Sequence, residues 1–397
     1  MIAKFALRMV REVDPRLLWK FSYNFGWKGM RAVQKFEARK RRGEHFPAFL
    51  FLSVTDRCNL SCQGCWVTQA SPAREMAVET LDNIIRECKA RGSHFFGLLG
   101  GEPLLHKGLF ELLGKHPDCY FLLFTNGTLI TSETAQTMRR LGNVSPLISI
   151  EGLETVSDER RGGRNVYGRA LDGLAHCHAN RLVTGVATSV CKSNFDDLAN
   201  EAFVREIAAR GAHYCWYYIY RPVGPNPTPA LALDNEQVRA LRQFMVDIRP
   251  RAPLMVVDAY WDHDGNALCP AAVGIGHHVG PGGDIEPCPP IQLADRNVGD
   301  GAGLGAAVAE SPFLARFREE IAEKTRGCVL LEDPALLSEI AKNTGAYDST
   351  GRDAAFEELA RMHPCGSHHQ PGLEIPEKSF LYRFAKKHWF FGFGAYG

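Results

Sequence analysis

Six strand-like runs that alternate with helix-like segments constrain the fold of this chain more than any other feature. The runs are apolar and aromatic, and the segments between them have apolar residues three or four positions apart. The runs lie at residues 48–54, 95–99, 120–125, 147–150, 183–190 and 213–220. Strand–helix units in series predict an α/β fold with a parallel sheet and right-handed crossovers. Six units suit a partial (β/α)6 TIM-like barrel or an open doubly wound sheet, and periodicity alone does not separate the two.

Hydropathy excludes several classes of protein. The 397 residues contain no run of 18 or more apolar residues, so no helix is expected to span a membrane. The first fifteen residues lack the apolar stretch and the cleavage site of a secretory signal. We therefore expect a cytoplasmic protein whose twelve cysteines stay reduced. Five cysteines lie singly in apolar or helical surroundings and are expected to fill the core: Cys88, Cys119, Cys177, Cys191 and Cys215.

The formal net charge of +1 hides an uneven distribution of charge. Residues 1–46 hold 12 basic and 4 acidic residues, residues 377–397 hold 4 and 1, and the segment between them has a net charge of −10. The acidic centre disfavours nucleic acid as a partner. Both ends are rich in aromatic residues, and basic residues beside aromatic ones are typical of peripheral membrane elements. The alternative is that both ends pack on the outside of a barrel and close its open end.

Helical patterns continue at both sides of the six units. Apolar residues at positions 2, 5, 6, 9 and 10 predict an amphipathic helix over residues 2–12. One or two further helices are expected over residues 17–42, with a break near Gly26 and Gly29. Helices are also expected at 235–248, 311–324, 334–342 and 353–362, and a hairpin around Gly282-Gly283-Asp284.

Three cysteines follow the first strand directly: Cys58, Cys62 and Cys65. Their C-x3-C-x2-C spacing allows a short loop to bring three sulfurs to one centre, as thiolates do around iron–sulfur clusters. A four-iron cluster held by three thiolates keeps one iron open for a small-molecule ligand. Structural zinc needs four ligands, and no further Cys or His follows before Cys88. The spacing therefore favours a [4Fe–4S] cluster.

Together with the strand ends that follow, this spacing resembles the radical S-adenosylmethionine (radical SAM) superfamily. Its members carry C-x3-C-x2-C after the first strand of a six-unit partial barrel. Three further motifs follow in the family's order after strands two, three and four: Gly100-Gly101-Glu102-Pro103, Thr125-Asn126-Gly127 and Ser149-Ile150-Glu151-Gly152. Active sites of barrels of this kind lie at the carboxyl ends of the strands, where all of these motifs stand.

The resemblance implies a role for each motif. S-Adenosylmethionine would bind the open iron and be cleaved reductively to a 5′-deoxyadenosyl radical, which abstracts hydrogen from a substrate or adds to it. Gly100, Gly101, Glu102 and Pro103 would bind the methionine amino group, and Asn126, Ser149 and Glu151 would contact the rest of the cofactor. An external reductant such as flavodoxin or ferredoxin is implied. One departure concerns adenine: family members often have an aromatic residue before the third cysteine, where this chain has Gly64, followed after Cys65 by Trp66.

The segment from Cys269 to Cys288 resembles the SPASM/Twitch extension of radical SAM proteins, in which cysteines flank a hairpin at an auxiliary iron–sulfur site. The tight run of cysteines in the full SPASM pattern is missing. We expect one auxiliary [4Fe–4S] cluster held by Cys269, Cys288, Cys328 and Cys365. The expected domains are basic amphipathic helices (1–46), the radical SAM partial barrel (47–250), the auxiliary-cluster extension (251–376) and a basic aromatic tail (377–397).

Histidines and aromatic residues give weaker signals. The pairs His277-His278 and His368-His369 stand in Gly-rich or polar segments and are expected to be exposed. Alternation along residues 213–220 directs half of its side chains inward, so one or two aromatic residues there are expected to line the substrate pocket.

Three interpretations of the substrate remain open from the sequence. The basic aromatic ends favour a lipid or another apolar metabolite at the inner surface of the cytoplasmic membrane. The SPASM/Twitch resemblance favours a peptide, as in radical SAM maturases. The third interpretation is a non-catalytic iron–sulfur electron carrier. In such a protein the motifs Gly100-Gly101-Glu102-Pro103 and Ser149-Ile150-Glu151-Gly152 would have no function.

Overall fold

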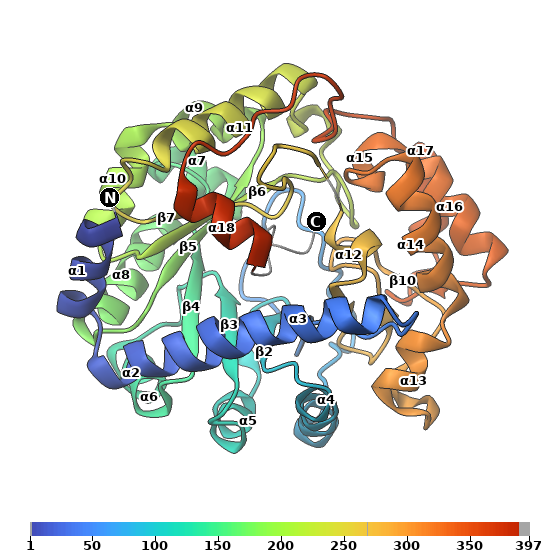
Figure 1. The fold of residues 1–397 in the computed structure, drawn as a ribbon, viewed down its shortest axis with the longest axis horizontal. Coiled ribbons are helices and arrows are strands. Elements are labelled where there is room, and N and C mark those ends of the chain that lie inside the picture. The colour runs from blue at the N-terminus through green and yellow to red at the C-terminus, as the bar shows by residue number, and fades with distance from the viewer. Residues whose placement is uncertain (1, 268, 389–397) are drawn as a thin grey trace.

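The computed structural model describes residues 2–267 and 269–388 and contains one nine-stranded sheet (Figure 1). Six strands lie side by side in chain order and all run parallel: β1 (Phe49–Ser53), β2 (Phe95–Leu99), β3 (Tyr120–Thr125), β4 (Val144–Ser149), β5 (Gly185–Val190) and β6 (Tyr214–Ile219). Parallel β7 (Met255–Val257) extends the sheet beyond β6. Parallel β8 (Gly276–Val279) and antiparallel β9 (Ile285–Glu286) extend it beyond β1. The predicted partial (β/α)6 barrel is confirmed.

Helices cover the outer face of this sheet, as the crossovers of parallel strands require. They are α4 (Val78–Ala90), α5 (Leu109–Lys115), α6 (Ser132–Leu141), α7 (Glu154–Arg161), α8 (Val166–Ala179), α9 (Phe195–Leu198), α10 (Glu201–Ala209) and α11 (Asn235–Ile248). Their apolar stripes and the outward side chains of the strands form the main core, in which Cys88, Cys119, Cys177 and Cys215 are buried. Cys191 is buried as well, so all five predicted core cysteines are confirmed.

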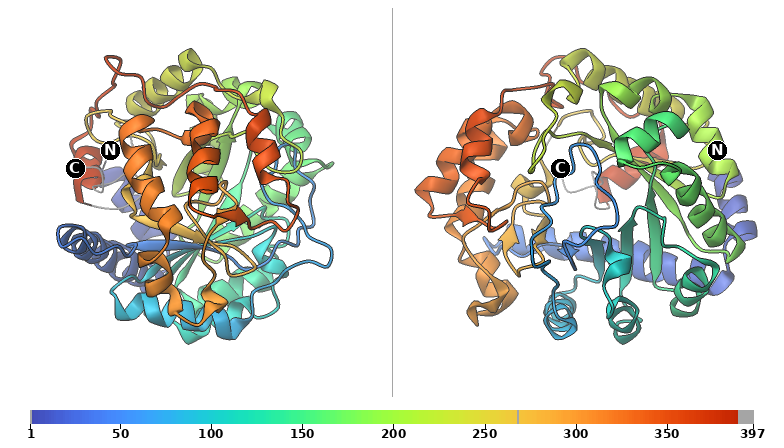
Figure 2. Two further views of the ribbon diagram at one scale, coloured as in Figure 1. Left: turned by 90° about the vertical axis from the view of Figure 1, so that its right-hand side faces the viewer. Right: turned by 180° about the vertical axis from the view of Figure 1, so that it is seen from behind.

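The chain beyond β9 forms a helical layer on one side of the barrel (Figure 2). Its elements are β10 (Leu293–Ala294), α13 (Gly303–Ala309), α14 (Pro312–Lys324), α15 (Val329–Glu332), α16 (Pro334–Asn343), β11 (Tyr347–Asp348) and α17 (Ala355–Arg361), with α12 (Pro270–Val273) before β8. Strands β7, β8 and β9 come from residues after 250 and yet belong to the main sheet. The proposed division at residue 250 therefore crosses a continuous sheet.

The amino-terminal helices close the end of the barrel at which the strands begin. After α1 (Ile2–Glu12), a continuous helical rod runs through α2 (Pro15–Lys20), the π-helical segment η1 (Phe21–Trp27) and α3 (Lys28–Lys40). Phe25 packs on Phe95 of β2 with ring centroids 4.9 Å apart, and Phe21 packs on Tyr120 of β3 at 5.5 Å. These contacts lie at the first residues of both strands.

The predicted break near Gly26 and Gly29 does not end the helical rod, although the π-helical η1 gives way to α3 between these two glycines. Both glycines are buried inside the rod. The cost of glycine within a helix, about 1 kcal/mol, is small beside the packing of Ala32, Val33 and Phe36 against the inner face of the sheet.

The helix α18 (Phe380–His388) lies beside α3 at the same end of the barrel (Figure 1). A buried ion network ties it to the barrel: Lys386 donates to Asp258 at 3.1 Å, and Arg242 pairs with Glu377 at 2.7 Å. Arg249 contacts both carboxylates. The predicted aromatic tail continues through Trp389, Phe390 and Phe391, which lie outside the described residues. Among the described residues, no helix combines the length and apolar character needed to cross a membrane.

Candidate active site

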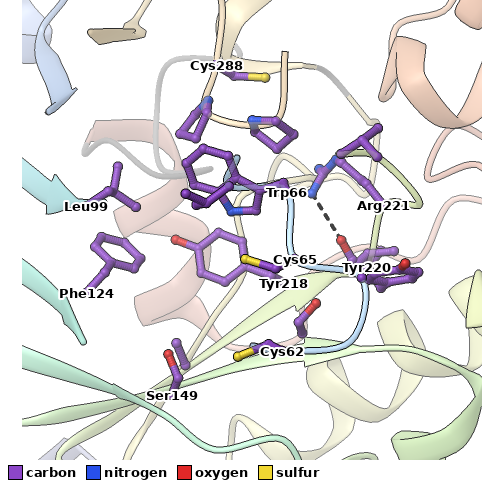
Figure 3. A pocket seen from close by; sticks show the side chains of 18 of the residues that line it. Cys62, Cys65, Trp66, Leu99, Phe124, Ser149, Tyr218, Tyr220, Arg221 and Cys288 are labelled. Carbon is purple, nitrogen blue, oxygen red and sulfur yellow. Dashed lines mark hydrogen bonds between the residues drawn. The ribbon is translucent and has the colours of Figure 1, made fainter. Parts of the chain in front are cut away.

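Two groups of three cysteines line a single cavity of about 770 Å³ inside the barrel. Figure 3 shows Cys62, Cys65 and Cys288 among its lining residues. Cys58, Cys62 and Cys65 belong to the loop after β1 and stand at the carboxyl ends of the strands. The second group comes from the carboxyl-terminal part of the chain and consists of Cys269, Cys288 and Cys328. Cys365 is not among the residues that line this cavity. The structure thus brings together six of the seven predicted metal ligands.

The first group of thiols is close enough for its members to affect one another. Burial raises the pKa of Cys58, and the neighbouring Cys62 adds to this shift. Burial likewise raises the pKa of Cys65 to about 11, with contributions from Cys62 and Cys58. Thiols of this kind are neutral at pH 7 and must lose protons when they bind iron.

The two glycines after β2 allow the cysteine loop to lie directly against the strand end. The Gly101 amide donates to the Thr55 carbonyl at 2.8 Å. A Cβ at Gly101 would lie 2.2 Å from the Arg57 carbonyl oxygen, and one at Gly100 would lie 2.3 Å from that of Thr55. Gly100 also has φ +154, a conformation that only glycine adopts readily. Both glycines border the cavity. Because they have no Cβ, the backbone of the cysteine loop can pack directly against them.

Glu102 is fully buried, and its carboxylate accepts hydrogen bonds from neighbouring protein groups. It accepts hydrogen bonds from Thr125 Oγ1 at 2.8 Å, from the Asn126 amide at 2.8 Å and from the Leu104 amide at 3.1 Å. Desolvation raises its pKa. Neither Glu102 nor Pro103 borders the cavity, whereas Asn126 does. The expected contact of Glu102 with an ammonium group stays a prediction, and in this structure the carboxylate joins the ends of β2 and β3.

Ser149 and Glu151 border the cavity at the end of β4, where the motif Ser149-Ile150-Glu151-Gly152 predicts them. Glu151 accepts a hydrogen bond from the Ser189 amide at 2.8 Å and pairs with Arg161 at 2.7 Å. The other side of the Arg161 guanidinium reaches Cys62 Sγ at 3.8 Å. Burial alone would lower the pKa of Arg161, but Glu151 and Cys62 raise it.

Sequence reasoning missed Arg161 and the role of the helix end that carries it. Arg160 donates to the Gln63 carbonyl at 3.1 Å, and the Gln63 amide donates back to the Arg160 carbonyl at 2.9 Å. Gly162, at φ +67, approaches Ser61 so closely that a Cβ would lie 2.0 Å from its carbonyl oxygen. Hydrogen bonds and close packing therefore hold the end of α7 against the cysteine loop. The available signal was the basic pair before Gly162-Gly163 at a helix end.

Gly64 makes room for an aromatic ring that comes from another part of the chain. A Cβ at Gly64 would lie 2.2 Å from the Tyr220 hydroxyl and 2.8 Å from two atoms of its ring. Arg160 lies over the other part of this ring, 5.0 Å from its centroid. Tyr220 thus supplies, from the segment after β6, an aromatic surface beside the third cysteine.

Aromatic side chains of β3 and β6 form part of the cavity wall. Trp216 and Tyr218 of β6 stack with ring centroids 5.4 Å apart, and Phe124 of β3 packs beside both. Tyr217, between them in sequence, points to the outer core, so the predicted alternation is confirmed. The Tyr218 hydroxyl is buried without a hydrogen-bond partner among the described residues and is available to a bound molecule.

The expected exposure of the histidine pairs is wrong: three of the four residues are buried, and His369 is half-buried. His277 and His278 are buried because residues 276–279 form β8, which pairs with β1, rather than a loop. His278 is held by Ser53, whose Oγ lies 2.8 Å from its Nε2, and by Glu286 at its Nδ1. His368 is buried against Tyr260, with ring centroids 4.5 Å apart, and also borders the cavity.

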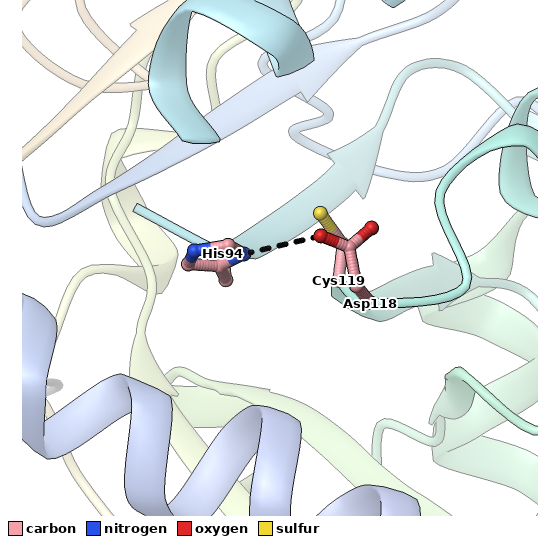
Figure 4. A group of neighbouring side chains, drawn as sticks. All are labelled: His94, Asp118 and Cys119. Carbon is pink, nitrogen blue, oxygen red and sulfur yellow. Dashed lines mark ion pairs between the residues drawn. The ribbon is translucent and has the colours of Figure 1, made fainter. Parts of the chain in front are cut away.

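A separate group of potential metal ligands, His94, Asp118 and Cys119, lies near the amino ends of β2 and β3 (Figure 4). Lys89 already pairs with Asp118 at 2.7 Å. Burial and the nearby Lys28 lower the pKa of His94 to about 4, and burial raises that of Cys119 to about 12. Lys89 and Lys28 therefore supply the positive charge beside Asp118, and no metal ion is needed to balance this carboxylate.

The residues present fit two iron–sulfur clusters. Each group has three thiols at the cavity and a buried arginine beside one of them, Arg161 at Cys62 and Arg221 at Cys328. Thiolates are the ligands of such clusters, and buried cations balance the negative charge that ligated thiolates carry.

Comparisons with known proteins agree with this chemistry. Residues 52–201 match the family model of the Radical SAM superfamily. The chain is 26% identical over 271 residues to the sporulation killing factor maturation protein SkfB of Bacillus subtilis, which is 64% of this chain and 62% of SkfB. It is 31% identical over 176 residues to GTP 3′,8-cyclase of Parasynechococcus marenigrum, 41% of this chain and 49% of that relative. The chain therefore spans less than two thirds of the length of these relatives.

Solved structures share the fold. The crystal structure of Streptococcus suis SuiB bound to its precursor peptide SuiA superimposes with a TM-score of 0.60 at 16% identity, covering 72% of this chain and 70% of SuiB. SuiB bound to S-adenosylmethionine gives a TM-score of 0.61 at the same identity, with 72% and 71% covered. Both cover more of the chain than residues 52–201, so the similarity in fold continues into the extension.

Proposed function

We propose that this chain is a radical SAM enzyme, as the family match over residues 52–201 indicates, and that it modifies a peptide by radical chemistry started at the first group of cysteines. The single observation that carries this proposal is the cavity that both groups of cysteines line. A substrate in that cavity lies between the two groups, which is the arrangement needed if both act on it.

A peptide substrate is favoured over a lipid by the relatives. SkfB is a maturation protein, and SuiB has been solved with a precursor peptide. The similarity to SkfB extends over 271 residues, far beyond the 150 residues of the superfamily domain. No relative among those compared supports the lipid interpretation of the sequence.

The first group of cysteines and its surroundings would hold the cofactors. Cys58, Cys62 and Cys65 would ligate a [4Fe–4S] cluster, which together with bound S-adenosylmethionine supplies one-electron cleavage of a sulfonium C–S bond. Ser149 and Glu151 present hydrogen-bond acceptors at the same rim, as ribose hydroxyls require. We propose a small redox protein such as flavodoxin or ferredoxin as the electron donor.

The remaining residues of the cavity orient the substrate and exclude water. Phe124, Trp216 and Tyr218 form an apolar wall from which water is readily displaced. The Tyr218 hydroxyl can donate to a peptide carbonyl. Side chains with large apolar surfaces fit this wall best, so the modified residue of the peptide is expected to be apolar or aromatic.

The test compares cells that carry the wild-type chain with cells that carry Cys58→Ala. Mass spectrometry of small peptides should show a mass change that is present only with the wild-type chain. A change confined to the lipid fraction would contradict the proposal. In vitro, the reconstituted chain should contain about eight irons if two four-iron clusters form, and it should release 5′-deoxyadenosine under reducing conditions.

We also propose that the amino-terminal rod binds the surface of an anionic membrane. Trp19, Tyr23 and Trp27 follow one another at every fourth position and are 67%, 45% and 53% exposed. Exposed Arg31 and Lys35 continue the same spacing toward the end of α3. Aromatic side chains beside cations suit the interface of a bilayer with anionic headgroups.

Two observations add to this membrane proposal. Phe380 and Phe384 of α18 are 81% and 46% exposed, and α18 lies beside α3 (Figure 1). This end of the barrel is opposite the cysteine loop (Figure 2), so membrane contact would leave the cavity accessible.

Flotation with anionic vesicles should be lost in the triple variant Trp19→Ser, Tyr23→Ser, Trp27→Ser. It should be kept in Leu373→Ser, which changes a 51% exposed residue of the carboxyl-terminal extension. Equal binding to zwitterionic vesicles would contradict the charge argument.

A further inference from the structure

Arg221 stands beside the second group of cysteines and has no acidic partner. Its Nε donates to Cys328 Sγ at 3.0 Å, and its Nη1 donates to the Ile219 carbonyl at 3.1 Å. The guanidinium lies over the ring of Tyr260, 5.3 Å from the centroid. Among the residues that the structure describes, no carboxylate forms an ion pair with Arg221. Its side chain borders the cavity from the segment after β6.

Three other arginines with little exposure are balanced by carboxylates, whereas buried Arg160 bonds to Gln63 and lies over the ring of Tyr220. Arg161 pairs with Glu151, and Arg242 and Arg249 pair with Glu377 and Asp258. A buried cation without an anion is strongly unfavourable, because the charge loses its hydration without compensation. A negative charge near Arg221 would remove this cost, and three thiols line the same cavity as its side chain: Cys269, Cys288 and Cys328.

Three sulfurs share the cavity with Arg221. Cys328 Sγ lies 3.0 Å from Arg221 Nε, and Cys269 and Cys288 line the same cavity. A centre bound by these three thiolates would therefore place its negative charge beside the guanidinium.

Cys365 does not belong to this group. Its thiol donates to the His363 carbonyl at 3.4 Å, and Lys192 is the charged neighbour that affects its pKa. It lies outside the cavity that the other three cysteines line.

We propose that Cys269, Cys288 and Cys328 are the protein ligands of the auxiliary cluster, without Cys365, and that Arg221 is a positioning residue that balances the charge of this centre. A fixed cation beside a cluster stabilises its reduced, more negative form and so raises its reduction potential. The inference depends on the iron–sulfur part of the proposed function and not on the peptide substrate.

The test measures the reduction potential of the auxiliary centre in the absence of substrate and turnover. The full chain carries Cys58→Ala, Cys62→Ala and Cys65→Ala, so that only the auxiliary centre gives a signal after anaerobic reconstitution. Titration followed by electron paramagnetic resonance should show a more negative potential in Arg221→Met and a potential close to that of the parent in Arg221→Lys. Failure of the peptide proposal would leave this result unchanged.

The matched control is Arg352→Met. Arg352 also borders the cavity, but it pairs with Glu358 at 2.5 Å, so its loss should leave the potential unchanged. Loss of auxiliary iron in Arg221→Met but not in Arg221→Lys would also support the proposal, because the charge is then needed for loading. An unchanged potential in Arg221→Met at full iron content would overturn the role of Arg221.

The ligand set is tested separately by iron content. In the same background, Cys269→Ala, Cys288→Ala and Cys328→Ala should each lose most of the auxiliary iron, whereas Cys365→Ala should keep it. Loss of iron in Cys365→Ala equal to that in Cys328→Ala would overturn the proposed set of three ligands.

Discussion

The two groups of cysteines face the same cavity but balance their charge in different ways. At the first group, Arg161 is shared between Cys62 and the carboxylate of Glu151. At the second group, Arg221 contacts Cys328 and no carboxylate of the described chain. The first arginine is thus neutralised whether or not the thiols are ionised, whereas the second depends on the thiols alone.

The difference extends to how each group is held. The first group lies on a loop fixed by backbone contacts with Gly100, Gly101 and Gly162. The second is gathered from three distant segments, before α12, after β9 and at the start of α15. We infer that the first site is largely preformed, whereas the second needs the negative charge of its bound centre to complete it.

The largest expected effect is the loss of S-adenosylmethionine cleavage when a cysteine of the first group, but not of the second, is replaced. Cys58→Ala should reduce the iron content from about eight to about four per chain and abolish 5′-deoxyadenosine formation, because the first centre is lost. Cys288→Ala should cause the same loss of iron but retain the cleavage of S-adenosylmethionine. Both are measured on anaerobically reconstituted protein by iron analysis and chromatography. Loss of cleavage in Cys288→Ala with four irons present would contradict the division of roles.

The next effect concerns the shared arginine of the first group. Arg161→Met leaves the buried carboxylate of Glu151 without its cation, which should cost about 3–5 kcal/mol in the free energy of unfolding of the apoprotein. Adding Glu151→Gln should recover part of this loss, since the uncompensated charge is then removed. The matched control is Arg205→Met, which breaks a solvent-exposed pair with Glu201 and should leave the free energy of unfolding nearly unchanged. Denaturant unfolding measures all three.

A smaller effect should follow from crowding the cysteine loop. In Gly101→Ala the new Cβ meets the Arg57 carbonyl oxygen at 2.2 Å, so the backbone must shift at a cost of about 1–3 kcal/mol. The first centre should then load less iron while the second is unaffected. Gly114→Ala in α5 is the control, because its Cβ meets only Leu141 at 3.7 Å and alanine favours a helix. Equal iron content in both variants would count against a preformed loop.

The smallest expected effect is the pH dependence of iron loading, which should be similar at the two groups. Burial raises the pKa values of Cys65 and Cys269 to about 11. Below that pH each of these thiols must release a proton to bind iron, so loading should strengthen by up to about tenfold per thiol for each pH unit gained. Competition with a chelator at pH 7, 8 and 9 measures the slope. A slope of zero at either group would show that its thiols are already ionised.

The sequence was a good guide wherever a local pattern determines the structure. The six runs became β1 to β6 because alternation with helical segments leaves a parallel sheet as the simple solution. The motifs at the strand ends brought Asn126, Ser149 and Glu151 to the cavity for the same reason.

The failures all involve partners that are distant in the chain. The sequence predicts an exposed pair at His277-His278, but both residues are buried because β8 pairs with β1, more than 200 positions away in the chain. Gly26 and Gly29 do not break the rod, because packing on the sheet outweighs glycine's low helix propensity. Cys365 resembles the other three cysteines in sequence, and only the folded chain separates it from the cavity. Tyr220 beside Gly64 is likewise a contact that no local pattern encodes.

The most direct test of two iron–sulfur centres in one cavity is a crystal structure of the reconstituted chain with data collected at the iron absorption edge. Two anomalous peaks are predicted, one beside Cys58, Cys62 and Cys65 and the other beside Cys269, Cys288 and Cys328. A single peak at the first group, or a second peak ligated by Cys365, would contradict the account.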